Sequence, residues 1–501
     1  MRRLSLYLLL FVALFGATGC PQEPEGQPPV ITLPDGKIYT VELGESITLS
    51  PVFDQLTEGT TITWLSDGKP VGTGKTFTFT PSEAGVFYFT VEAVNQFGKA
   101  FAEVRIDVRK PEDPTPPDPT PPDPPEPTPQ PVDTPLFVFD QAEYHVAVGR
   151  TIRLLPLDLD STRHYTFTWQ IDGSVRQEGE QPLFRFEATA QGTFHVDFRA
   201  TDGEHTADTT LTVVVCPPEG TYRRKAASTS SPNAAKVYSY LPAPGQYVNE
   251  NYTALTPEEA CDYAMNRMKQ GYYVSLGGFG GSLVVGFDHS IESDGDYNFA
   301  VKNVIYSQYS EPGIVWVMQD ENGDGLPNDT WYELKGSEYG LDCTVQDYAV
   351  TYIRPSAPAM PVSWTDNHGG SGSIDYLVAY HKQDYYYPLW VKENSYTLRG
   401  TRLQARNYDQ SGRGTYWVNP DYGWGYADNY SEIDLLPERA TGVTKGCNHF
   451  KISDAVTFDG RPANLQYIDF VKVQTGLNAK SGWLGELSTE VMDIIDFNLV
   501  K

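Results

Sequence analysis

Residues 61–68 read TITWLSDG, and residues 166–173 read TFTWQIDG. Both runs alternate polar and apolar side chains up to a tryptophan and end in Asp-Gly, a pattern typical of a strand that enters a tight turn. The same distance of 105 residues separates further matching pairs, namely Tyr39 and Tyr144, Gly44 and Gly149, and Trp64 and Trp169. This diverged repeat indicates two copies of one module.

Each module, which we assign to residues 31–109 and 136–216, combines short alternating strands with a central tryptophan. This combination predicts an immunoglobulin-like sandwich with Trp64 and Trp169 in its core. The paired intersheet cysteines of antibody domains are missing, so the modules resemble the PKD-type or bacterial Ig-like modules of surface proteins.

Between the modules, residues 110–135 form a proline-rich linker with acidic residues between the prolines. Such a segment favours an extended polyproline II spacer of about 3.1 Å per residue. We therefore predict a stalk. The alternative, a proline-rich ligand for a partner domain, suits a cytosolic signalling protein better.

The N-terminus has the features of a secretion signal over residues 1–20, followed by a tether over 21–30. An apolar run over residues 4–15 follows two arginines and is too short for a membrane helix of about 20 residues. The run ends in ATGC, which resembles the lipobox of bacterial lipoproteins and implies cleavage before an acylated Cys20; a plain secretory signal is the alternative. Glu23 and Glu25 resemble the acidic export tag of Bacteroidota. These resemblances imply an outer-membrane lipoprotein, held by its lipid anchor and facing the extracellular side.

The chain has 501 residues and a formal net charge of −28, with acidic residues throughout. This charge argues against nucleic-acid binding, which needs a basic face, and suits solubility and cation binding. Besides Cys20 there are four cysteines, Cys216, Cys261, Cys343 and Cys447. They allow three disulfide pairings, or all four could be free.

After a linker over 217–235, residues 236–501 form a third region that we predict to be the ligand-binding domain. One helix is expected after Thr256, with Pro257 in its first turn, Glu259 closing a capping box and Gly271 ending it. The apolar runs at 282–287 and 313–318 and the alternating run at 468–473 predict strands. The fold class is therefore all-β, with two Ig/PKD-like sandwiches and a larger β-sandwich or jelly-roll domain that contains one embedded helix.

The run DENGDGLPND at 320–329, followed by TWYE, is an acidic loop between two predicted strands. Asp320, Asn322, Asp324 and Asn328 stand at the first, third, fifth and ninth places, with Gly325 at the sixth, which is the oxygen spacing of a Ca²⁺ loop. Trp331 replaces the glutamate of an EF-hand, so Asp329 or Glu333 would have to complete the coordination. The alternatives are an unliganded turn-forming loop and, less favoured, an acid-base pair.

Aromatic residues set among glycines and amides suit stacking on a sugar ring or a flat cofactor. Two such stretches occur, at 385–390 and 416–428. The alternative is that these rings cover a large β core. The residues we select as candidate ligand-binding side chains are Trp390, Trp417, Tyr422, Trp424 and Tyr426.

The sequence contains no His-Glu-x-x-His and no Gly-x-Ser-x-Gly motif. Cys447 and His449 are close in sequence, but that proximity alone does not make a nucleophile pair. Glu486, Glu490 and Asp493 could include the carboxylate pair of a glycosidase. We therefore predict a non-catalytic binder, and keep a carbohydrate-binding or adhesion protein, or a glycoside hydrolase, as the alternative.

Four segments carry a resemblance to a group of Bacteroidota cell-surface lipoproteins: GGSLVVGFDHS (280–290), SEPGIVW (310–316), DFVKVQTG (469–476) and GWLGELSTE (482–490). Some members are similar to proteins encoded beside TonB-dependent transporters, including those for vitamin B12 and other cobamides. The resemblance implies capture of a scarce small molecule at the cell surface and its delivery to such a transporter. The resemblance does not identify any residue that would bind a cobamide.

Overall fold

The computed structural model describes residues 28–33, 38–66, 69–109, 137–160 and 162–501. The predicted signal peptide, Cys20 and the proline-rich linker lie outside the described residues. None of the described helices combines the length and the apolar character needed to cross a membrane. The chain divides into two compact units, Met1–Thr128 and Pro129–Lys501, which we describe separately.

The first unit contains the first module. Its five-stranded sheet has the order β2 (Ile38–Glu42), β9 (Gly98–Arg109), β8 (Gly85–Asn95), β5 (Thr61–Ser66) and β6 (Lys69–Thr73). Two strand pairs accompany it, β3 (Ile47–Leu49) with β7 (Phe77–Phe79) and β1 (Val30–Thr32) with β4 (Val52–Asp54). Trp64 is fully buried and stacks on Phe77 with ring centroids 5.2 Å apart, so its ring joins the sheet to the β3–β7 pair.

The second module begins the second unit and repeats this topology. Its sheet has the order β10 (Glu143–Ala147), β16 (Thr206–Cys216), β15 (Gly192–Thr201), β12 (Thr166–Ile171) and β13 (Ser174–Gly179), and β11 (Thr151–Leu154) pairs with β14 (Phe184–Glu187). Trp169 is fully buried and stacks on Phe184 at 5.3 Å. In both modules the first strand of the large sheet runs parallel to the last, as β2 does to β9 and β10 to β16.

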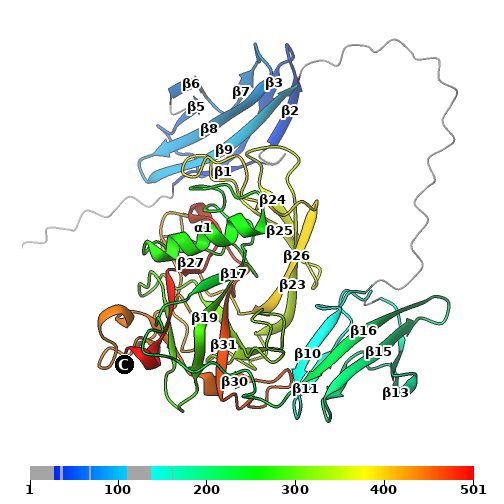
Figure 1. The fold of residues 1–501 in the computed structure, drawn as a ribbon. Helices are drawn as coiled ribbons and strands as arrows, with labels where there is room; N and C mark the ends of the chain where they lie inside the picture. The colour runs from blue at the N-terminus through cyan, green and yellow to red at the C-terminus, as the bar shows by residue number, and fades with distance from the viewer. Residues whose placement is uncertain (1–27, 34–37, 67–68, 110–136, 161) are drawn as a thin grey trace, which may run out of the picture. The chain divides into compact units, whose positions relative to one another are not determined.

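The C-terminal domain is built on a six-stranded sheet (Figure 1). Its order is β17 (Lys236–Leu241), β19 (Ser282–Glu292), β31 (Tyr467–Thr475), β21 (Gly313–Met318), β22 (Trp331–Leu334) and β30 (Ala455–Val456). The three strands predicted at 282–287, 313–318 and 468–473 correspond to β19, β21 and β31. These three are neighbours in the middle of the sheet, and nearly all of their side chains are buried.

Smaller sheets complete this domain. A four-stranded sheet has the order β25 (Ser371–Ile374), β24 (Val362–Asp366), β23 (Val345–Ile353) and β26 (Ser395–Arg402). A three-stranded sheet has the order β29 (Asn448–Phe450), β20 (Phe299–Lys302) and β33 (Asp493–Asp496). Two further strand pairs are β18 (Val274–Ser275) with β32 (Glu490–Val491) and β27 (Tyr408–Asp409) with β28 (Trp417–Val418). One hydrophobic cluster spans the large sheet, the four-stranded sheet and the first helix. The predicted all-β class is confirmed.

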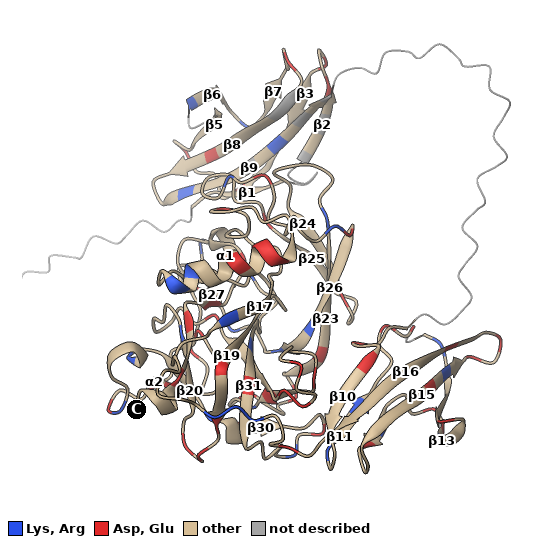
Figure 2. Ribbon diagram, in the orientation of Figure 1, with Lys and Arg blue, Asp and Glu red and all other residues tan. Residues whose placement is uncertain are grey.

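The predicted helix is α1, Pro257–Lys269. Thr256 Oγ1 accepts the N–H of Glu259 at 3.2 Å, and Glu259 Oε2 accepts the N–H of Leu255 at 2.8 Å. These contacts form a capping box whose return bond reaches one residue beyond the N-cap. The acidic first turn and basic last turn, visible in Figure 2, suit the helix dipole. A second short helix, α2 (Glu432–Leu435), was not predicted.

Residues 217–235, predicted as a linker, pack along the C-terminal domain. Arg224 forms an ion pair with the buried carboxylate of Asp469 at 3.0 Å, and its N–H donates to Ser290 Oγ at 2.9 Å. The ring of Tyr222 covers the backbone of Gly323, where an added Cβ would lie 2.6 Å from the ring. This segment therefore belongs to the packed structure around the acidic loop.

Candidate functional site

The acidic loop joins the antiparallel strands β21 and β22 and is a hairpin tip, as predicted. The backbone N–H groups of Gly323 and Gly325 donate to the two carboxylate oxygens of Asp320 at 2.8 and 3.1 Å. The N–H of Leu326 donates to Asp324 Oδ1 at 2.7 Å. Asp side chains thus fold the loop through local side-chain to backbone bonds, as in Asx turns.

Most of the predicted calcium ligands gather in this loop. Asn322 Nδ2 and Asn328 Nδ2 both donate to Asp324 Oδ2 at 2.9 Å. Asp329 Oδ2 accepts the N–H of Glu321 at 3.1 Å. Its Oδ1 is buried without a hydrogen-bond partner in the described part of the chain, with His145 Nδ1 3.9 Å away. Burial, and then repulsion from Asp320 and Asp324, raises the pKa of Asp329 to about 8. The crowding of oxygens suits a hard cation. Calcium binding in this loop stays a prediction.

Glu333 does not join this set. It lies in β22, where its Oε2 accepts the hydroxyl of Thr401 at 2.6 Å. Burial raises its pKa to about 7, against the opposing effects of the Thr401 hydrogen bond and the charge of Lys472. Because its carboxylate is held within the sheet, the structure removes Glu333 from the predicted calcium ligands.

Three of the five predicted ligand-binding aromatics are core residues. Trp390, Tyr422 and Tyr426 are all buried. The Tyr422 hydroxyl donates to the carbonyl of Gln404 at 2.7 Å, and the Tyr426 hydroxyl accepts the N–H of Glu338 at 2.9 Å. These rings fill the domain, in agreement with the packing alternative, and their faces are not open to a ligand.

Trp417 and Trp424 are only partly buried, and their surroundings differ. The Trp417 indole packs so closely on Gly482 that an added Cβ would lie 2.4 Å from its Nε1. Trp424 instead lines a cavity of about 200 Å³, which we call the Trp424 pocket. The residues that line this pocket are Tyr297, Leu334, Lys335, Trp424, Gly425, Ile433, Asp434, His449, Phe450, Lys451 and Asp454.

His449 gives the Trp424 pocket its distinctive chemistry. Its Nδ1 lies 2.7 Å from the carbonyl oxygen of Asp434 and must donate there, because a carbonyl can only accept. Burial lowers the pKa of His449, so the imidazole is neutral and Nε2 keeps a free lone pair. This Nε2 is buried and has no hydrogen-bond partner among the residues that the structure describes. Burial also raises the pKa of the neighbouring Asp434 carboxyl to about 7.

A second, wider cavity of about 460 Å³ lies along α1. Tyr252 and Tyr263 stack there with ring centroids 5.6 Å apart, and Tyr252 is 46% exposed. Amide and charged side chains surround the rings, namely Asn251, Glu259, Asp262, Asn266, Arg267 and Gln270. The sequence analysis did not select this surface, because its aromatic residues are separated along the chain.

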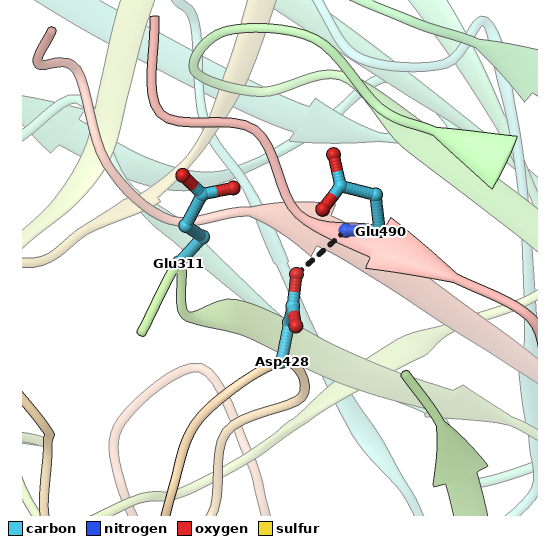
Figure 3. Close-up of side chains that lie close together, drawn as sticks. All are labelled: Glu311, Asp428 and Glu490. Atoms are coloured by element: carbon cyan, nitrogen blue, oxygen red, sulfur yellow. Dashed lines mark hydrogen bonds between the residues drawn. The ribbon is translucent and has the colours of Figure 1, made fainter. Parts of the chain in front are cut away.

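A cluster of three carboxylates is not predictable from the spacing of its members along the chain. Glu311, Asp428 and Glu490 come from three distant segments, and each offers an oxygen within 4.8 Å of the others. Figure 3 shows the three side chains converging on one space. Glu490 had been considered only with Glu486 and Asp493, whose spacing along the chain did not reveal Glu311 or Asp428.

The four cysteines outside the signal are free, with Cys216 and Cys447 buried. Burial raises the pKa of the Cys447 thiol to about 12. At neutral pH this thiol is protonated and a poor nucleophile, so Cys447 and His449 do not form a nucleophilic pair.

Residues 28–95 match the family model of the PKD-like domain. The match covers most of the first module, so the chain contains a PKD-like domain. No curated protein matches the chain.

Solved structures with similarity to the chain are Ig-like, fibronectin-like and PKD domains. The fibronectin(III)-like modules of Clostridium thermocellum CbhA are 12% identical, with 40% of this chain and 100% of that chain covered and a TM-score of 0.16. The titin Ig tandem A164–A165 is 18% identical, with coverages of 39% and 100% and a TM-score of 0.14. The PKD domain of human KIAA0319 is 13% identical, with coverages of 20% and 98% and a TM-score of 0.16.

Proposed function

We propose that this protein is a non-catalytic lipoprotein of the outer-membrane surface whose C-terminal domain binds a small nutrient and passes it to a TonB-dependent transporter. The signal and lipobox-like Cys20 support the location. The PKD-like module, its repeat and the proline-rich linker support a spacer that carries the C-terminal domain away from the membrane. The Trp424 pocket supports the binding role.

The observation that carries this proposal is His449 Nε2, which is buried without a hydrogen-bond partner among the described residues, in a pocket that Trp424 also lines. A buried acceptor without a donor costs about 1–3 kcal/mol, which a ligand N–H or O–H would recover. The indole offers a face on which an apolar or flat group can stack. The pocket therefore suits a ligand group that is flat or apolar on one side and carries a donor at its edge.

The volume of the pocket limits the ligand further. Cavities that enclose drug-sized ligands measure roughly 300–1,000 Å³, and this one measures about 200 Å³. It would admit one end group of a larger molecule, such as an amide side chain or the nucleotide end of a cobamide. Cobalamin is the nutrient that the family resemblance suggests, so it is the first probe to use.

Calorimetric titration of the full mature chain with cobalamin tests this proposal. We expect Trp424→Ala and His449→Gln each to weaken binding at least about tenfold, or about 1.4 kcal/mol. Trp483→Ala is the matched control, because Trp483 is 41% exposed and does not line the pocket. Equal affinity in wild type, Trp424→Ala and His449→Gln would refute the pocket as the binding site. Failure of wild type to bind cobalamin would refute the cobamide assignment.

The cavity along α1 favours a second candidate function, binding or cleavage of a glycan. Tyrosine faces with surrounding amides are the chemistry that holds a sugar ring. Titration with cello-, xylo- and mannan oligosaccharides, with Tyr252→Ala as the variant, would detect such binding. An assay for released reducing ends, run alongside, would identify a glycoside hydrolase and overturn the non-catalytic assignment.

A further inference from the structure

Backbone contacts fix the positions of the three converging carboxylates. The N–H of Glu311 donates to the carbonyl of Asp428 at 2.9 Å, and the N–H of Glu490 donates to Asp428 Oδ2 at 2.8 Å. Asp428 has a left-handed backbone, with φ 52°, which is costly for a residue with a side chain. Glu311 precedes β21, and Glu490 is the first residue of β32. The cluster therefore connects these two strands to the loop that contains Asp428.

The cluster is partly reachable from solvent but is electrostatically unbalanced. Asp428 is buried, whereas Glu311 and Glu490 keep some exposure. Burial, followed by repulsion from nearby carboxylates, raises the pKa of Glu311 and Glu490 well above the usual range. The charges that raise the pKa of Glu311 belong to Asp428 and Glu486. Glu490 is affected by the same two carboxylates and by Glu311.

Glu486 provides an independent observation at the same place. Its side chain is 97% buried, its Oε1 accepts the N–H of Gln246 at 2.7 Å, and its Oε2 has no hydrogen-bond partner among the described residues. Glu486 lies four residues before Glu490, on the run that leads into β32. Its charge acts on both Glu311 and Glu490. An unpaired carboxylate oxygen in such surroundings lacks a positive partner.

We infer that Glu311, Asp428 and Glu490, with Glu486 beside them, bind one Ca²⁺ ion. Each Ca–O distance is about 2.3–2.6 Å. Three oxygens that lie within 4.8 Å of one another can therefore all reach one ion placed between them. The donors are all oxygens, without the nitrogen or sulfur that zinc prefers. Mg²⁺ generally takes only one or two carboxylates and keeps its waters, so a site with three or four favours Ca²⁺.

Calcium binding to the full mature chain, stripped with chelator and titrated in a calorimeter, tests this inference. We expect Glu490→Gln and Glu311→Gln each to bind one Ca²⁺ fewer per chain than wild type, or to bind it at least about tenfold more weakly. Glu438→Gln is the control, because Glu438 is exposed and lies outside the cluster. Asp324→Ala separates this site from the acidic loop and should leave the cluster's ion in place.

Melting of the same variants in chelator separates lost binding from lost folding. Replacing one of the crowded carboxylates by its neutral amide removes repulsion, so Glu490→Gln should melt no lower than wild type. The inference is overturned if wild type binds no Ca²⁺ at millimolar concentration, or if both amide variants bind as wild type does. It is also overturned if Asp324→Ala alone removes all bound Ca²⁺, or if Mg²⁺ binds more tightly than Ca²⁺ at the Glu490-dependent site.

Discussion

Asp324 accepts hydrogen bonds from the side-chain amides of both Asn322 and Asn328, so three of the predicted loop ligands meet at one carboxylate. The neighbouring Asp329 contributes Oδ1, which is buried without a hydrogen-bond partner among the described residues and lies 3.9 Å from His145 Nδ1. A cation in the loop would relieve the repulsion between these carboxylates. The loop is thus chemically distinct from an ordinary hairpin tip, in which the side chains only shape the turn.

We expect Ca²⁺ to raise the melting temperature of the Glu490→Gln chain, in which the separate carboxylate cluster is disabled. A ligand at about 100 times its Kd stabilises the folded state by about 2.7 kcal/mol, which is several degrees for a domain of this size. Asp324→Ala, added to the same chain, should abolish the rise. Differential scanning calorimetry with and without chelator makes the comparison. A Glu490→Gln chain that melts alike in both buffers would leave the loop as a turn without a metal.

Single residues also show what the sequence could and could not reveal. Trp64 and Trp169 were placed in the core because they sit at equivalent points of a repeat with clear alternation, and both are fully buried. Tyr422 and Tyr426 stand among glycines and polar residues along the chain, and Trp390 follows a run of tyrosines, yet all three are buried. Local composition cannot distinguish these two situations.

At the scale of elements, β19 and β33 are connected through a buried histidine. His289 is 1% exposed, and its two nitrogens lie 2.6 Å from Asp288 Oδ1 and 2.8 Å from Asp496 Oδ2. Burial opposes protonation of His289, but the hydrogen bonds to the two carboxylates outweigh it and raise its pKa above the usual range. The contact between His289 and Asp496 therefore links the six-stranded sheet to the three-stranded one.

This link predicts a pH dependence of stability. Because the pKa of His289 is raised in the folded state, its contribution to the free energy of unfolding is complete below the unfolded pKa of about 6.5. This contribution is lost as pH rises through the folded pKa. We expect the free energy of unfolding of wild type to fall above about pH 6.5, and the fall to be smaller in His289→Gln. Urea unfolding at pH 6, 7, 8 and 9 measures both. Parallel pH profiles for the two proteins would show that His289 carries no such linkage.

Elements with a strong local signal were the most predictable. The α1 helix was found from Thr256, Pro257 and Glu259, and β19, β21 and β31 were found from apolar runs. The helix α2 has four residues, a length at which sequence periodicity carries no information. The carboxylate cluster was missed for a different reason: Glu311, Asp428 and Glu490 meet only after β21 and β32 have taken their places in the fold.

At the scale of the whole molecule, the second module contacts the C-terminal domain through the acidic loop. The N–H of Ala147, at the end of β10, donates to Glu321 Oε2 at 2.9 Å, and both groups are buried. The hydroxyl of Thr330 donates to the carbonyl of His145 at 3.0 Å. Burial, and then the charge of Asp329, raises the pKa of Glu321 to about 8, so this carboxyl is mostly protonated at neutral pH.

We expect Glu321→Ala to lower the free energy of unfolding by about 1–3 kcal/mol, because the buried N–H of Ala147 loses its acceptor. Glu321→Gln keeps an acceptor and a neutral group, so it should stay within about 0.5 kcal/mol of wild type. Glu438→Ala, on an exposed surface, is the control for loss of a glutamate. Midpoints of urea unfolding of the full chain at pH 7 report the difference. Equal midpoints for the Ala and Gln variants would show that this contact does not stabilise the protein.

The parallel pairing of first and last strands in each module has a mechanical consequence. The chain enters β10 at one end of the sheet and leaves β16 at the opposite end, and β2 and β9 are arranged in the same way. Tension applied along the chain would pull the two strands past each other, so the hydrogen bonds between them would bear the load together and would not open one by one. We therefore expect both modules to resist stretching, a property that would suit the cell-surface location that we propose.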